Sequence, residues 1–215
     1  VVLATGASSF LPPIENLRTA NNVIGLRNLD DAIRIKEIAP KVKNIIILGA
    51  GLVGVDAMAG LLDYDAKVTM IEMGDRILPL QLDHYAANVY IERLKEEGVD
   101  FRFNVRAEKV IVDENNNPVA IKLNTGEEVP GELIIACTGV RSNVGFLEGS
   151  GIECDKFGLI FNPKGETNVK DVYGAGDISG RNPIWPTAVK EGLIAANNMC
   201  NKDIYMEDFF GSKNT

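Results

Sequence analysis

The sequence predicts an α/β fold built on a parallel sheet, with antiparallel strands after it. A continuous apolar strand pattern at residues 44–48 and a second strand pattern at residues 67–72 flank a helical pattern at residues 52–62. Apolar runs without polar alternation are typical of strands that a parallel sheet buries on both faces. Beyond residue 100 the pattern changes to short strands separated by turns rich in Asn, Gly and Pro. With 215 residues and 46% apolar content, the chain can hold one large or two small domains.

The first forty residues, which precede this sheet in sequence, contain one strand pattern and one helix pattern. An apolar strand pattern at residues 1–4 ends in the turn Thr5-Gly6, and Pro12-Pro13 excludes a helix in the segment that follows. Residues 29–38 have the spacing of a short amphipathic helix, with acidic residues at its start and Pro40 beyond its end. Because a buried-strand pattern opens the chain without a methionine or a basic leader, we expect the sequence to be a piece of a longer protein.

The elements after the first sheet strands follow in order. Apolar residues on one face predict a helix at about residues 83–97, with Gly98 as its C-cap. A meander and a returning core strand are expected next, at residues 101–106, 109–113, 119–123 and 132–136. Beyond Thr138-Gly139 the chain is rich in loops. Its expected elements there are two strands and a helix with proline in its first turn, at residues 158–161, 172–173 and 186–199.

A glycine pattern marks the turn between the first sheet strand and its helix. Residues 49–54 read G-x-G-x-x-G, directly after a strand and at the start of a helix, as a dinucleotide site requires. The first glycine permits a tight turn, the second lets the backbone approach a pyrophosphate, and the third allows close helix–strand packing. The helix N-terminus offers free N–H groups to the phosphates. We therefore expect a Rossmann-like sheet with dinucleotide-binding residues Gly49, Gly51, Leu52, Val53 and Gly54.

An acidic residue indicates which dinucleotide binds. Glu72 lies at the end of the second strand, about twenty residues after the glycine pattern. A carboxylate there accepts hydrogen bonds from a ribose 2′-hydroxyl and repels a 2′-phosphate, so it selects NAD(H) over NADP(H). Arg76, in the run 75–79, could contact a phosphate. We favour a salt bridge to Asp75 or another nearby carboxylate, because Glu72 already fills the discriminating position.

Taken in order, these and later motifs resemble the pyridine nucleotide-disulfide oxidoreductase family of FAD- and NAD-dependent flavoproteins, in its NADH oxidase, NADH:rubredoxin reductase and nitrite reductase branch. The shared motifs include two Thr-Gly turns, at residues 5–6 and 138–139, and the glycine pattern at 49–54. The others are V-x-x-I-E at 68–72, D-R-I-L-P at 75–79 and V-Y-x-x-G-D at 172–177. The resemblance covers nearly the whole chain. An N-terminal FAD fingerprint and a C-terminal domain, which the family also has, are not among the matched motifs.

The resemblance implies an NAD-binding domain inserted into a partial second α/β domain of the FAD type. The expected divisions are an FAD-domain fragment, the NAD-binding domain, a second FAD-domain segment and a tail, at residues 1–22, 23–139, 140–201 and 202–215. On the NAD side it adds Gly139 and Asp56, which stands where the family usually has a glutamate near the nicotinamide.

The resemblance also implies an FAD site. Asp177, after the tight turn at Gly176, would accept a hydrogen bond from the ribityl chain. The helix start at Thr187-Ala188 would face the flavin pyrimidine edge, where the helix dipole stabilises a reduced anionic ring. Thr5 and Gly6 complete the FAD set. No catalytic side chain is assigned, because the cofactors carry the redox chemistry.

The implied activity is an FAD-dependent NADH oxidoreductase that passes hydride from NADH to flavin and on to an acceptor. The acceptor is left open between rubredoxin, nitrite-reductase centres, oxygen and a disulfide. The run 185–188 together with residues 197–199 favours the rubredoxin and nitrite-reductase branch. The alternative is a non-catalytic NAD(H)-sensing regulatory domain, against which Gly176-Asp177 and the helix after it argue. We expect the piece to be inactive alone, and a homodimer stays open.

Composition narrows the partners and the compartment. Thirty acidic against twenty-two basic residues give a formal net charge of −8, and no basic cluster follows a predicted helix, so a nucleic-acid partner is not expected. No apolar run reaches the length of about 18 residues that a membrane span needs. Cys137, Cys154 and Cys200 fit neither a disulfide framework nor a zinc site, and His84 is the only histidine. We therefore expect no metal and a cytoplasmic protein.

Overall fold

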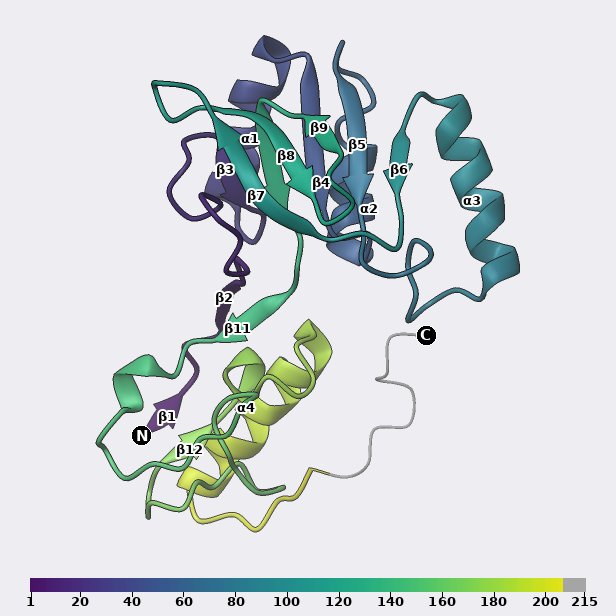
Figure 1. Ribbon diagram of the computed structural model, residues 1–215. Helices are drawn as coiled ribbons and strands as arrows, with labels where there is room; N and C mark the ends of the chain where they lie inside the picture. Colours follow the sequence, from purple (N-terminus) through teal and green to yellow (C-terminus); the bar gives the residue numbers. More distant parts are fainter. Residues whose placement is uncertain (207–215) are drawn as a thin grey trace. The chain divides into compact units, whose positions relative to one another are not determined.

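The chain forms two compact units. In the computed structural model, which describes residues 1–206, the larger unit is Ser9–Gly139, and the smaller unit combines Val1–Ser8 with the chain from Val140 onward. Figure 1 labels most of the helices and strands of both. The tail predicted for residues 202–215 lies outside the described residues from residue 207 on.

A five-stranded parallel sheet lies at the centre of the larger unit (Figure 1). All four neighbouring pairs run parallel, as the apolar runs predict. The strands, in spatial order, are β3 (Val23–Gly25), β10 (Leu133–Ala136), β4 (Asn44–Leu48), β5 (Lys67–Ile71) and β6 (Asp100–Arg102). The sheet is therefore Rossmann-like, with the glycine pattern directly after its central strand β4.

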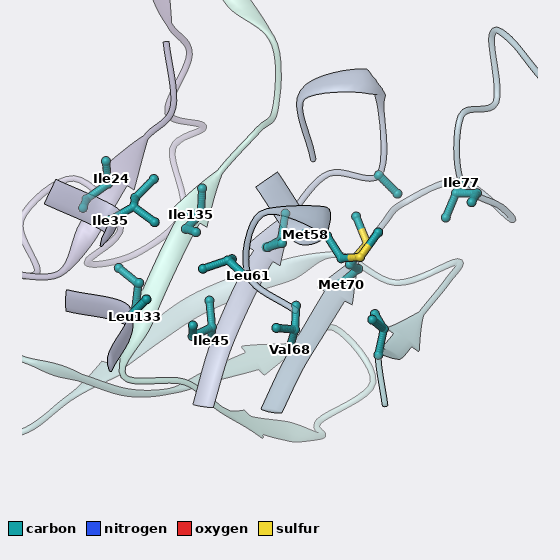
Figure 2. Close-up of a cluster of buried hydrophobic side chains, with 14 of the residues drawn as sticks. Ile24, Ile35, Ile45, Met58, Leu61, Val68, Met70, Ile77, Leu133 and Ile135 are labelled. Atoms are coloured by element: carbon teal, nitrogen blue, oxygen red, sulfur yellow. The ribbon is translucent and has the colours of Figure 1, made fainter. Parts of the chain in front are cut away.

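Helices cover one face of this sheet. They are α1 (Leu29–Ile38), α2 (Leu52–Ala59) and α3 (His84–Glu96), and a 3-10 turn, η1 (Ala39–Lys41), follows α1. Ile45 and Ile47 of β4 are fully buried in the cluster on this face. Figure 2 shows the cluster, whose labelled members are Ile24, Ile35, Ile45, Met58, Leu61, Val68, Met70, Ile77, Leu133 and Ile135.

A three-stranded antiparallel meander packs on the other face. It consists of β7 (Ala107–Val112), β8 (Pro118–Leu123) and β9 (Glu128–Pro130). Ile46 and Leu48, which alternate with the two isoleucines of the helical face, pack here with Val110 and Ile121. Since successive side chains of a strand point to opposite faces, the apolar run of β4 serves two separate cores.

The order of the short strands differs from the sequence prediction. Residues 101–106 were expected to open the meander, but β6 pairs in parallel with β5, with Phe101 opposite Met70, and so ends the main sheet. The meander instead gains β9, which the sequence did not predict. A three-residue strand has too little pattern of its own to show which sheet it joins, so tertiary pairing decided both cases.

The boundary expected at residue 22 also differs, because residues 9–22 belong to the larger unit. Leu17 is fully buried in the core beneath the meander. Asn16 donates its side-chain N–H to the carbonyl of Val110 at 3.0 Å, and the backbone N–H of Asn21 donates to Asn116 at 2.9 Å. The segment is thus held by the meander, which follows it by about ninety residues in sequence.

The smaller unit has little regular sheet. β1 (Val2–Leu3) pairs in parallel with β12 (Tyr173–Gly174), and β11 (Val140–Ser142) pairs with β2 (Ala7–Ser9). Its helical segments are η2 (Gly145–Leu147), η3 (Gly176–Ser179) and α4 (Trp185–Met199). The strand expected at residues 158–161 is reduced to one isolated bridge, between Cys154 and Leu159. Its core, formed by Leu147, Leu159 and Ile178, is correspondingly small.

The described part of the predicted tail is attached to this unit. Buried Asn198 donates to the carbonyl of Ile204 at 2.7 Å and accepts from its N–H at 2.9 Å. Lys164 forms an ion pair with Asp203. The division expected at residue 201 therefore does not separate residues 202–206 from the rest of the unit. In the part of the chain that the structure describes, no helix has the length and apolarity needed to cross a membrane.

Candidate functional site

The glycine pattern forms a tight crossing at the end of β4. A Cβ atom on Gly49 would approach the carbonyl oxygen of Cys137, and one on Gly54 would overlap the carbonyl oxygen of Gly49. A Cβ on Gly51, in contrast, would meet no described atom within 4 Å. The outer glycines thus close the packing of strand and helix, while the middle one leaves the backbone open on the side from which a phosphate can approach.

The first turn of α2 is available to an anion. Gly51 is its N-cap residue and provides no side-chain cap within the described chain. Leu52 and Val53, each 47% exposed, follow it in the first turn. The first N–H groups of a helix have no partner inside it and carry the positive end of the dipole, so this end is suited to a pyrophosphate.

Glu72 is held firmly at the same end of the sheet. Its Oε2 accepts the N–H of Ala50, within the glycine pattern, at 2.8 Å, and its Oε1 accepts the N–H of Gly74 at 2.7 Å. Each carboxylate oxygen can accept a further hydrogen bond, so the group can still receive ribose hydroxyls. Arg76 makes the predicted salt bridge to Asp75, at 2.8 Å, and also donates to the carbonyls of Leu82 and Pro79.

A cleft of about 460 Å³ joins these features within the larger unit. It lies at the carboxyl ends of parallel strands, where open α/β sheets bind their ligands. Two glycines of the pattern and Glu72 line it together with residues that the sequence did not assign to a site. Those missed residues include Pro12, Pro13, Met73, Val105 and Arg106. Only the order of strands and the packing of residues 9–22 bring them to the cleft.

Two predicted NAD residues lie elsewhere in the larger unit. Asp56 lines a separate hollow of about 200 Å³ between α1 and α2, and it is not among the residues that line the cleft of Glu72. The reason is its place on α2, more than one turn beyond the helix start. Gly139 is exposed, has a φ of +97° and accepts the N–H of Phe10 at 2.9 Å. A contact of either residue with NAD stays a prediction.

The smaller unit brings together the residues predicted for FAD. Thr5 and Asn143 hold one another: the Thr5 hydroxyl donates to the Asn143 carbonyl at 2.8 Å, and the Asn143 side chain donates to the Thr5 carbonyl at 2.9 Å. The N–H of Asn143 donates to Gly6. The hydroxyl of the preceding residue, Ser142, donates to the carbonyl of Asp177 at 2.9 Å. Ser142 and Asn143 therefore link the Thr5-Gly6 turn to Asp177, a role that no sequence motif indicated.

The start of α4 lies against the same turn. A Cβ on Gly176 would lie 3.3 Å from the Cβ of Ala188, so η3 and α4 approach closely there. Thr187 is 1% exposed, and its hydroxyl has no hydrogen-bond partner among the described residues. Ile184, the N-cap residue, provides no side-chain cap to α4 in this part of the chain. A buried hydroxyl without a partner, at a helix start without a side-chain cap, fits the polar pyrimidine edge of a flavin.

Metal ligands do not gather in the described residues. In residues 1–206, no group of three or more His, Cys, Asp or Glu side chains is arranged to hold a metal ion. Cys137, Cys154 and Cys200 are free thiols. Burial raises the pKa of Cys137, in the wall of the larger unit's cleft, to about 12, so this thiol is neutral at physiological pH.

Comparisons with known proteins identify the family. The family model described as pyridine nucleotide-disulphide oxidoreductase matches residues 1–192. The chain is 28% identical, over 99% of its length, to the NADH-dependent phenylglyoxylate dehydrogenase subunit epsilon of Aromatoleum evansii, of which it covers 51%. It is 29% identical, over 93% of its length, to the NADH oxidase of Methanocaldococcus jannaschii, of which it covers 46%.

A solved structure supports the same relationship. A NAD-dependent persulfide reductase from A. fulgidus matches with a TM-score of 0.86 and 27% identity, over 95% of this chain and 39% of that one. The chain thus spans about half the length of the curated relatives named here. Because the family model matches nearly its whole length, the chain belongs to the pyridine nucleotide-disulphide oxidoreductase family of flavin- and NAD(P)H-dependent oxidoreductases.

Proposed function

We propose that the chain is the NADH-binding part, and a portion of the FAD-binding part, of an FAD-dependent NADH oxidoreductase. The larger unit is the NAD-binding domain and the smaller unit belongs to the FAD-binding domain. The observation that carries the proposal is the cleft at the end of β4, where an open glycine turn, a free helix start and an anchored carboxylate converge. When bound, the nicotinamide and flavin rings supply the hydride chemistry, and the protein binds and orients them.

In this proposal the larger unit selects NADH through Glu72. The two backbone N–H groups that hold its carboxylate fix the direction in which its remaining acceptor positions point. A 2′-phosphate brought to this carboxylate would meet like charge. Arg76, four residues after Glu72, is already bonded to Asp75 and two carbonyls. Arg106, which also lines the cleft, forms an ion pair with Glu108. These pairings support discrimination against NADPH.

Calorimetric titration with NADH and NADPH tests this assignment. We expect the intact protein to bind NADH more tightly than NADPH, and Glu72→Ala to reduce that preference by about tenfold or more, as loss of a hydrogen bond to a charged group does. Glu92→Gln, which removes an exposed carboxylate on α3, is the matched control and should leave the preference unchanged. Equal dissociation constants for the two nucleotides in the unchanged protein would refute the proposal.

We further propose that the electron acceptor is a redox protein or a redox centre on another chain, rather than oxygen or a disulfide. The sequence at 185–188 and 197–199 supports this, and one relative is named as a subunit of a larger dehydrogenase. Steady-state NADH oxidation by the FAD-loaded protein decides it: a rubredoxin- or ferredoxin-type protein should be reduced faster than oxygen. Faster reduction of oxygen or of a disulfide such as that of coenzyme A would overturn this choice.

We propose a cytoplasmic location, which the three free thiols support. A homodimer is one possible form of the intact protein, and light scattering of the purified protein measures its oligomeric state directly.

A further inference from the structure

Glu191 is a half-buried carboxylate to which the family motifs assign no role. It lies on α4, four residues after Thr187 and therefore on the same face of the helix. Its Oε2 accepts a hydrogen bond of 2.6 Å from the backbone N–H of Gly176. This bond joins α4 to the first residue of η3, across fifteen residues of sequence.

Gly176 depends on this acceptor from another element. It is buried, it opens η3, and its φ of +78° lies in the left-handed region. Within the described chain, the N-cap residue Ala175 supplies no side-chain cap to η3. The first N–H groups of a helix have no partner inside it, and a buried N–H without an acceptor costs about 1–3 kcal/mol. Glu191 therefore holds the Ala175–Gly176 peptide group, one residue before Asp177.

The same bond fixes the spacing of the two halves of the FAD site. Gly176 and Asp177 form one half, and Thr187 and Ala188 form the other. The backbone of Gly176 lies close enough to Ala188 that an added Cβ would be 3.3 Å from its Cβ. On its other side, the carbonyl of Asp177 accepts from Ser142. Asp177 is thus held between an anchor on β11 and an anchor on α4, and only the second is ionisable.

The charge of Glu191 is unfavourable where it lies. Burial raises the pKa of its carboxyl, the Gly176 N–H lowers it, and the nearby carboxylate of Asp177 raises it again, with a net upward shift. A glutamine would present the same acceptor oxygen to Gly176 without this cost. The negative charge itself, one turn behind Thr187 at the start of the helix that faces the flavin in the proposed function, would oppose the gain of negative charge by that ring.

We propose that Glu191 is a positioning residue for the flavin: it anchors the Gly176–Asp177 turn to α4, and its charge lowers the midpoint potential of the bound cofactor. This inference rests on the proposed function. The anchoring and the charge are separable, because glutamine retains the acceptor and removes the charge, whereas alanine removes both.

The test compares Glu191→Gln and Glu191→Ala in the intact protein supplied with FAD. Glu153→Gln, an exposed carboxylate of the same unit, is the matched control. Glu191→Ala should weaken FAD binding and speed amide hydrogen exchange at Gly176, each by about tenfold, the effect of an unsatisfied buried N–H. Glu191→Gln should keep both close to the unchanged protein while raising the midpoint potential of the flavin. The control should alter neither quantity.

The outcomes separate the inference from the proposed function. Unchanged FAD affinity and unchanged Gly176 exchange in Glu191→Ala would overturn the anchoring. If that variant does not fold, Glu191→Gln decides, because a potential equal to that of the unchanged protein excludes the effect of charge. Failure of the unchanged protein to bind FAD would refute the proposed function instead, and amide exchange at Gly176 in the variants would still decide the anchoring.

Discussion

Single residues at the end of β4 determine how the cleft of the larger unit is shaped. Gly54 has no room for a side chain because the carbonyl oxygen of Gly49 occupies the space that a Cβ would take. Gly51 has that room, since no described atom lies within 4 Å of its Cβ position. The same residue type thus serves packing at one position and ligand access at the other.

This difference predicts opposite behaviour of two alanine variants. Gly54→Ala should destabilise the protein by about 1–3 kcal/mol, because an inserted methyl group forces backbone shifts. Gly51→Ala should change stability by less than about 0.5 kcal/mol and yet weaken NADH binding, because its methyl group points into the open cleft. Urea denaturation and calorimetry measure the two effects. Gly60→Ala, at the C-cap of the same helix, is the control, because its Cβ would make ordinary contacts of 3.7 Å.

Glu191 also makes stability depend on pH. Because the folded protein raises the pKa of this carboxyl above its usual 4.5, folding favours the protonated form. Its contribution is therefore fully present below pH 4.5 and is lost as the pH rises through the raised value. Glu191→Gln should match the unchanged protein at acidic pH and be more stable at neutral pH. Denaturation curves at several pH values measure this, and a variant that is less stable at neutral pH would contradict it.

At the scale of elements, β4 and the segment 9–22 show how pieces of the larger unit depend on one another. β4 sends Ile45 and Ile47 into one core and Ile46 and Leu48 into the other. The second core closes only when Leu17 fills it from a segment that has no regular structure over most of its length. The meander, the sheet and this segment therefore depend on one another through a shared core.

Leu17→Ala tests whether residues 9–22 stabilise the larger unit. Removing this fully buried leucine should lower the free energy of unfolding by about 2–5 kcal/mol. The apparent NADH affinity should fall as well, because part of the protein is then unfolded. Leu29→Ala, at a leucine that is 74% exposed, should cost far less. If both variants unfold at the same urea concentration, the segment makes no important contribution to this core.

At the scale of the whole chain, the two units differ in how much they can bury. The larger one has a five-stranded sheet with one apolar core on each face. The smaller one has a two-stranded parallel pair and a small cluster around Leu159. Since burial of apolar surface drives folding, the larger unit should be able to fold alone.

Expression of residues 9–139 and of residues 23–139 tests this expectation. The longer fragment should unfold cooperatively in circular dichroism and bind NADH as tightly as the intact protein. The shorter one lacks Leu17 and the hydrogen bonds of Asn16 and Asn21, so it should be less stable by several kcal/mol, about the cost of an emptied core position. Equal stability of the two fragments would place the boundary at residue 23 after all.

The sequence by itself determined the features that depend on neighbouring residues. The βαβ order around residues 44–72, the helix Leu29–Ile38 and the glycine pattern are encoded within short windows, because hydrophobic period and turn chemistry are local. The position of Glu72 at the end of β5 and the salt bridge of Arg76 could likewise be predicted, since each residue lies a fixed number of positions from a recognisable strand. The contact of Glu72 with a ribose stays a prediction.

Tertiary structure alone decided the features that join distant segments. Asn143 meets Thr5 across 138 residues, Ser142 meets Asp177 across 35, and Glu191 meets Gly176 across 15. None of these partners carries a local pattern, because a single polar residue in a loop or on a helix looks the same whether it faces water or a buried N–H. The physical reason is that such a hydrogen bond is specified by the burial of both groups together, which only the folded chain provides.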